Sequence, residues 1–319
     1  MTPVSAPGEL AVELAWSLWR ELGVPAPVRR HTDWLVVPEP LILFTAALGD
    51  RDRRLRDNAL AWCREHLLLI STRALRHTFT AEAWDVGAVA DFSAALGEHT
   101  PARWPGHEVG TAFTVAAEVP PLATLRAPSQ LALRMRALFG VGSRAEILRV
   151  LLAEVPHPVT IADLARAAHA TKRQTTETVE QLDWSGAVVV DRSRQPFRVR
   201  LRQREELSGL LGEPPEVAPS WGPLLRLLTA IASVLEDVES LPDDLAGAEL
   251  HRLLRTHAGQ VSRLGLDPPA PESGASFRRR TTSWCRELLE DVAAGVPDHL
   301  GFGLQRRQRA QALPHGEAG

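Results

Sequence analysis

Cysteine is nearly absent from this chain: Cys63 and Cys285 are the only two in 319 residues, and they lie far apart. They form neither a disulfide framework nor a chelating pair, so we expect a reducing compartment, the cytoplasm. No stretch approaches the roughly 20 apolar residues that a membrane-spanning helix needs. The first residues also lack the charged leader and apolar core of a secretion signal. The sequence therefore predicts no membrane partner.

Tyrosine is absent and lysine occurs once, at Lys172, so every other basic side chain except histidine is an arginine. Nine tryptophans supply most of the large aromatic surface, and we expect them in the core. The chain is 45% hydrophobic and 24% charged, which is typical of a water-soluble globular protein with two or three cores. Apolar residues recur mainly at helical spacing, so the predicted fold class is mainly α.

Motifs for catalysis are missing as well. The run from Leu138 to Ala145 superficially resembles the Gly-Ser loop of minimal nucleotidyltransferases, but that chemistry needs a paired Asp-x-Asp to hold two metal ions. The next aspartate, Asp163, stands alone. The histidines of the N-terminal half have no Cys or second His at metal-ligand spacing: His66, His77, His99 and His107. There is also no phosphate-binding glycine loop or nucleophile elbow. We expect no enzyme activity, no metal and no cofactor.

Three helices and a hairpin are predicted between residues 143 and 204. Residues 143–152 form an amphipathic helix, and prolines at 156 and 158 end it. Thr160 can cap a short second helix, and a tight turn near His169 leads into a third, at 171–184. Gly186 can close that helix in the left-handed conformation. Residues 187–190 and 197–201 then form a β-hairpin.

This order resembles the winged helix-turn-helix regulators of the multiple-antibiotic-resistance and arsenical-resistance types. Those families place Val179, Leu182, Gly186 and Val188 in the same pattern, as the core of a recognition helix and its following strand. The resemblance covers about a fifth of the chain. It implies that the third helix enters the major groove of DNA and that the hairpin touches the flanking backbone.

The residue types support a DNA interface independently. Arginine and lysine can pair with guanine, and glutamine with adenine. The predicted DNA-binding residues lie at the start of the third helix and on the hairpin: Thr171, Lys172, Arg173, Gln174, Thr176, Arg192, Arg194 and Arg198. Residues 129–204 hold thirteen basic and seven acidic residues, a balance of +6, which leaves −9 for the rest of a chain whose net charge is −3. A basic module in an acidic chain is typical of phosphate binding.

The predicted function is therefore sequence-specific regulation of transcription, by a cytoplasmic protein associated with the nucleoid and with double-stranded DNA as partner. Two alternatives stay open. A solvated helix start would have the same residue types. The module could also bind protein, as an adaptor or an antitoxin-like partner does.

Four regions are predicted: a helical domain at 1–128, the winged helix at 129–211, a second helical domain at 212–304 and a disordered tail at 305–319. An apolar stripe in the third region fits a homodimer interface, a pocket for an unknown effector, or plain intramolecular core. It is formed by Leu224, Leu225, Leu227, Leu228, Ile231 and Leu235. Residues 35–37 are predicted as a short strand.

Overall fold

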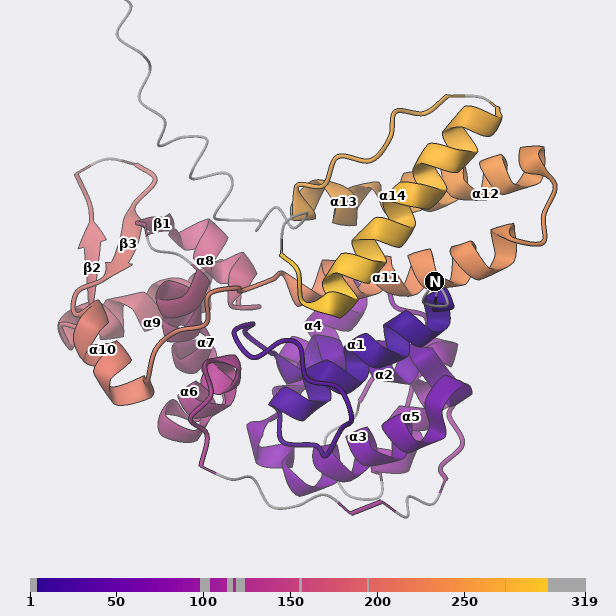
Figure 1. The fold of residues 1–319 in the computed structure, drawn as a ribbon. Coiled ribbons are helices and arrows are strands. Elements are labelled where there is room, and N and C mark those ends of the chain that lie inside the picture. The colour runs from indigo at the N-terminus through magenta and orange to yellow at the C-terminus, as the bar shows by residue number, and fades with distance from the viewer. Residues whose placement is uncertain are drawn as a thin grey trace, which may run out of the picture. The chain divides into compact units, whose positions relative to one another are not determined.

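The computed structural model describes residues 5–97, 104–113, 117–118, 124–154, 157–193, 195–272 and 274–297. Within these ranges the protein is mainly helical, as predicted, with one small sheet (Figure 1). The contacts divide it into two compact units. Unit 1 comprises described residues of 1–32, 37–123 and 220–300, and unit 2 comprises those of 33–36 and 124–219. Arg194 and the predicted tail at 305–319 lie outside the described residues.

Unit 1 consists of helices from both ends of the chain. They are α1 (Pro7–Glu21), α2 (Pro38–Leu48), α3 (Arg53–Glu65), α4 (Thr72–Ala81), α5 (Val86–Gly97), α11 (Trp221–Val238), α12 (Asp243–Thr256), α13 (Ala258–Leu264) and α14 (Ala275–Ala294). The helices before and after the central module therefore share one unit, where the sequence had suggested two separate domains.

The apolar stripe of α11 explains this arrangement. Its six aliphatic side chains are at most 1% exposed, and α11 packs against α1, α2, α12, α13 and α14. Helix α1 also packs against α14. Because a stripe of this kind stabilises a fold only when another apolar face covers it, the C-terminal helices need the N-terminal ones. The stripe is intramolecular core, and the alternatives of a dimer interface or a pocket along it are wrong.

Tryptophans build the centre of unit 1, as predicted. Trp19 and Trp62 are fully buried and meet edge to face with ring centroids 5.4 Å apart. Each indole N–H has a partner: Trp19 donates to Thr45 Oγ1 at 2.8 Å, and Trp62 donates to the Leu22 carbonyl at 2.9 Å. The prediction fails at Trp184 in unit 2, whose side chain is 82% exposed.

Unit 2 contains the residues of the predicted module. Its helices are α6 (Leu131–Phe139), α7 (Ser143–Arg149), α8 (Ile161–Ala167), α9 (Lys172–Trp184) and α10 (Arg204–Leu211), and its strands are β1 (Val159–Thr160), β2 (Val188–Asp191) and β3 (Arg198–Leu201). The strands form an antiparallel sheet in the order β1-β3-β2. The sequence analysis missed β1 and α10. A two-residue strand has no periodicity of its own, and it exists here because Val159 pairs with Val199.

Residues 35–37 form no strand. The Leu35 N–H donates to the Val217 carbonyl at 2.7 Å, and the Val36 N–H donates to the Ser129 carbonyl at 3.0 Å. Both partners are distant in sequence, so this extended segment is held by unit 2 without a regular ladder. In the described part of the chain no helix combines the length and the apolar character needed to cross a bilayer.

Candidate nucleic-acid interface

Side-chain caps fix where the module's helices begin. Thr160 Oγ1 accepts from the Asp163 N–H at 3.2 Å, and Thr171 Oγ1 accepts from the Gln174 N–H at 3.2 Å. Each threonine has extended backbone and satisfies an N–H that the first turn leaves without a partner. Both N-terminal boundaries follow from local signals. Thr171 is thus the cap of α9 and lies just before its first helical residue, Lys172.

One face of α9 is buried and the other is open. Thr175, Thr178, Val179 and Leu182 recur at helical spacing and are buried. Thr178 Oγ1 also lies 2.9 Å from Ser143 Oγ on α7, which fixes the rotation of α9 in unit 2. The opposite face therefore projects away from the core.

The first turn of the open face is basic and the later turns are acidic. Lys172 and Arg173 are exposed, and they are followed by exposed Glu177 and Glu180. The partial positive charge at a helix N-terminus adds to that of the two cations. A phosphate or an electronegative base edge is therefore attracted to the start of α9 and disfavoured further along it.

Two of the predicted α9 contacts, Thr176 and Thr171, form hydrogen bonds with the backbone of the helix itself. The Thr176 hydroxyl donates to the Lys172 carbonyl at 2.9 Å, so its proton is committed to the backbone. The Thr171 hydroxyl accepts a bond as the cap and retains its own proton for another acceptor. Gln174 is partly buried. Lys172 and Arg173 are the side chains that extend into solvent.

Arg173 has a partner in the next turn. Its Nε lies 2.9 Å from Glu177 Oε1, while the two side chains are 89% and 55% exposed. The hydrogen bond raises the pKa of Arg173, so the guanidinium stays charged. Ion pairs this exposed are weak because water screens them, and the guanidinium can exchange Glu177 for a nucleic-acid acceptor.

The arginines at 198, 200 and 202 share one face of the hairpin. Along β3 the side chains alternate, with Val199 and Leu201 buried. Arg198 is partly exposed, and Arg200 and Arg202 are exposed. The sequence analysis named only Arg198 of these three as a contact. The alternation Arg-x-Arg-x-Arg was the signal that would have found the other two, because residues two apart share a face of a strand.

Two of the predicted hairpin arginines, Arg192 and Arg198, have different partners. Arg192 lies 3.0 Å from Asp183, near the C-terminal end of α9, and Arg198 donates to the Pro158 carbonyl at 3.2 Å. Asp183 and Lys172 are separated by roughly 16 Å along a helix with the usual rise of 1.5 Å per residue. The predicted residues therefore form two groups, one at the start of α9 and one on the hairpin.

Part of the positive charge counted in the sequence is structural. Arg136 and Arg149 are 2% and 3% exposed and pair with buried Glu146. Arg204 donates to the carbonyls of Leu151 and Leu152. These three arginines hold unit 2 together, so the charge offered to a phosphate backbone is smaller than the +6 balance indicates.

The comparisons with known proteins give no relative. No family model matches the chain, and the comparisons with curated proteins and with solved structures give no match. Among the described residues, no group of three or more His, Cys, Asp and Glu side chains is placed to hold a metal ion.

Proposed function

We propose that unit 2 is a winged helix-turn-helix and that the protein uses it to bind double-stranded DNA in a sequence-specific manner. The observation that carries this proposal is the exposed pair Lys172 and Arg173 at the capped start of a helix whose other face is buried. In this reading α9 is the recognition helix, and β2 and β3 form the wing.

Each group has a role that its chemistry suits. Arg173 and Lys172 reach base edges in the major groove, where arginine pairs with guanine O6 and N7. The retained proton of Thr171 and the outward arginines of β3 contact phosphates, which fix register without reading sequence. The pair between Arg173 and Glu177 is exposed and weak, so the Arg173 guanidinium can exchange Glu177 for an acceptor on DNA.

Regulation of transcription in the cytoplasm follows as the wider proposal, because a protein that recognises one DNA site can block or recruit the transcription machinery there. The net charge of −3 limits unspecific attraction to DNA, so selectivity has to come from the base contacts.

The test is fluorescence anisotropy with duplex DNA from upstream of the protein's own gene, titrated with salt and with random-sequence competitor. Arg173→Ala should weaken binding to the specific site on the order of 10- to 100-fold and change random-sequence binding little. Arg255→Ala is the matched control, because Arg255 is an exposed helical arginine of unit 1. Equal losses on both DNAs would show that Arg173 does not read bases.

A protein-binding module remains the second candidate, and the 82% exposure of Trp184 favours it. Tryptophan is enriched at the centres of protein interfaces. If the folded protein did not bind DNA at physiological salt, the protein-binding module would be the better explanation.

A further inference from the structure

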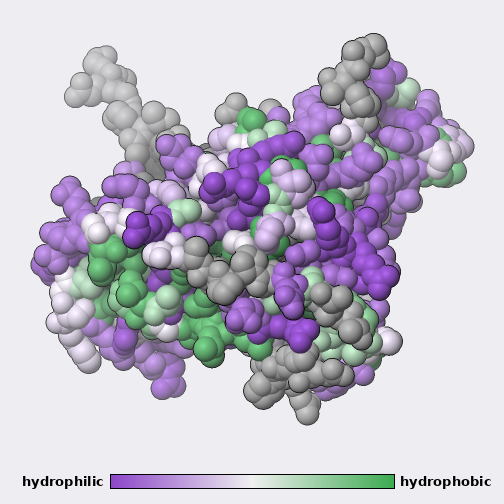
Figure 2. Space-filling view, turned by 60° about the horizontal axis from the view of Figure 1, so that its bottom comes forward, coloured by the Kyte–Doolittle hydropathy of each residue, from purple (hydrophilic) through white to green (hydrophobic). Residues whose placement is uncertain are grey.

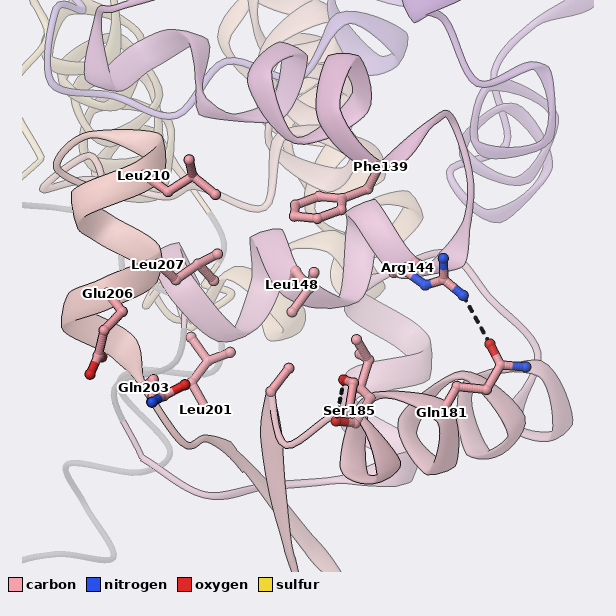
Figure 3. A pocket seen from close by; sticks show the side chains of 12 residues that line it. Phe139, Arg144, Leu148, Gln181, Ser185, Leu201, Gln203, Glu206, Leu207 and Leu210 are labelled. Carbon is pink, nitrogen blue, oxygen red and sulfur yellow. Dashed lines mark hydrogen bonds between the residues drawn. The ribbon is translucent and has the colours of Figure 1, made fainter.

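Unit 2 has an apolar groove that the DNA-binding proposal does not use. It encloses about 600 Å3 and runs between α6, α7, the end of α9, β3 and α10 (Figure 3). Its apolar walls are formed by Phe139, Leu148, Leu182, Leu201, Leu207 and Leu210. The space-filling view shows apolar residues gathered on one region of the surface (Figure 2).

Large exposed apolar side chains are close in sequence to the residues that line the groove. Leu138, Val141 and Trp184 are 54%, 38% and 82% exposed, and each stands next to or between lining residues in the sequence. Leu210, on the wall itself, is 67% exposed. Several large exposed apolar side chains in one module are unfavourable in water and typical of a protein interface. A small molecule would cover the groove floor but leave these flanking side chains in water, whereas a protein surface covers both.

The polar residues of the groove lie in two pairs, one at each end, and the two ends carry opposite charge. Arg144 donates to Gln181 at 3.0 Å at one end, and Gln203 and Glu206 lie at the other end (Figure 3). A twofold axis through the middle of the groove would bring Arg144 of one copy to Glu206 of a second copy, and Glu206 to Arg144. The charges are therefore self-complementary, as an isologous interface requires.

We infer that this groove is the site where a second copy of the chain docks, with Leu210 and Trp184 as the apolar anchors and two Arg144–Glu206 pairs at the rim. The interface lies at the C-terminal end of α9, roughly 18 Å along the helix from Lys172 at the usual rise per residue. It leaves the first turn of α9 open. Only the consequence for DNA rests on the proposed function: a twofold dimer presents two recognition helices and fits an inverted repeat.

The first experiment is sedimentation analysis of the full chain at a series of concentrations, without DNA. Wild-type protein should show a concentration-dependent dimer, and Leu210→Glu should raise the dissociation constant at least about tenfold. Leu68→Glu is the matched control, since Leu68 is 91% exposed and belongs to unit 1. A wild-type monomer at high micromolar concentration, or equal effects of both variants, would overturn the inference.

Charge reversal tests the pairing itself. Arg144→Glu and Glu206→Arg should each weaken the dimer, and the double variant should restore it, because the swapped charges attract again. Absence of rescue would overturn the proposed register even if a dimer exists.

Cross-linking keeps the inference testable if a substitution disturbs folding. Both native cysteines are buried, so an engineered thiol on the rim is the reactive one. A mixture of Arg144→Cys and Glu206→Cys proteins should cross-link with a short bismaleimide, while each protein alone should not. Cross-linking of either protein alone, or no cross-linking in the mixture, would contradict the twofold arrangement. These measurements involve no DNA, so they can succeed where the proposed function fails, and the reverse.

Discussion

Arg136 Nε donates to Glu146 Oε1 at 2.8 Å, and both side chains are buried between α6 and α7. Arg149 donates to the other oxygen of the same carboxylate at 2.8 Å, so one anion is shared by two guanidiniums. Burial raises the pKa of Glu146, but the two arginines outweigh that effect and hold it at about 2. The carboxylate is therefore charged at neutral pH, and the triad fixes α6 to the first helix of the module.

Replacing Glu146 with Gln should destabilise unit 2 strongly. The two buried guanidiniums would lose their anion, and breaking a buried ion pair costs about 3–5 kcal/mol. Urea unfolding followed by circular dichroism measures the loss. Glu249→Gln is the control: Glu249 pairs with Arg252 on the surface of α12. The free energy of unfolding of the Glu249→Gln variant should differ from that of the wild type by no more than about 1 kcal/mol. Similar losses in both variants would contradict a special role for the triad.

Stability of unit 1 should fall as the pH drops from 6.5 towards 4. Burial lowers the pKa of His31 to about 4, against its ordinary 6.5, and the neutral ring bridges Ser17 Oγ at 2.7 Å and the Val292 carbonyl at 2.8 Å. Because the folded-state pKa is the lower one, the unfolded chain binds the proton first. The contribution of neutral His31 to the free energy of unfolding is present above pH 6.5 and is lost as the pH falls. It is on the order of 3 kcal/mol in total.

Thermal unfolding across this pH range measures the effect. The slope of the melting temperature against pH should decrease in His31→Gln. It should persist in His77→Gln, since His77 is exposed. A change of pH dependence in the His77 variant alone would refute the assignment to His31. His257, whose pKa burial also lowers to about 4, contributes to the slope that remains.

Two glycines of unit 2 should respond oppositely to alanine. Gly186 has φ +76° and closes α9, with its N–H donating to the Asp183 carbonyl at 3.0 Å, whereas Gly209 is an interior residue of α10. A Cβ would meet nothing within 4 Å at either position, so the backbone conformation decides. Gly186→Ala should cost about 1 kcal/mol, and Gly209→Ala should stabilise by roughly 0.5–1 kcal/mol. Urea midpoints that move in the same direction would contradict this.

If the proposed function holds, Arg200→Ala should reduce the salt dependence of DNA binding. A lost phosphate contact lowers the slope of log K against log salt by about 1 and weakens every duplex alike. Arg173→Ala should instead change discrimination between sequences. Salt titrations of both variants on specific and random duplexes separate the two roles. If Arg200→Ala weakened binding to the specific duplex more than to the random one, Arg200 would contact bases and not the phosphate backbone.

The sequence by itself determined the local elements of this protein. The caps Thr160 and Thr171, the glycine at 186 and the apolar spacing of α9 act within a few residues, so their signals are complete in the chain. The exposed start of α9 followed from the same pattern, because a buried stripe at helical spacing leaves Lys172 and Arg173 outside.

Only the tertiary structure decided the rest, because it depends on residues distant in sequence. The α11 stripe was recognisable, but α1, α2 and α14 decide that it is core. Arg136 and Arg149 looked like surface charge until Glu146 was found between them. Trp184 looked like core material, yet the stripe that buries Leu182 turns it outward. Local hydrogen bonding and periodicity fix elements, whereas the burial of a given side chain depends on which other face covers it.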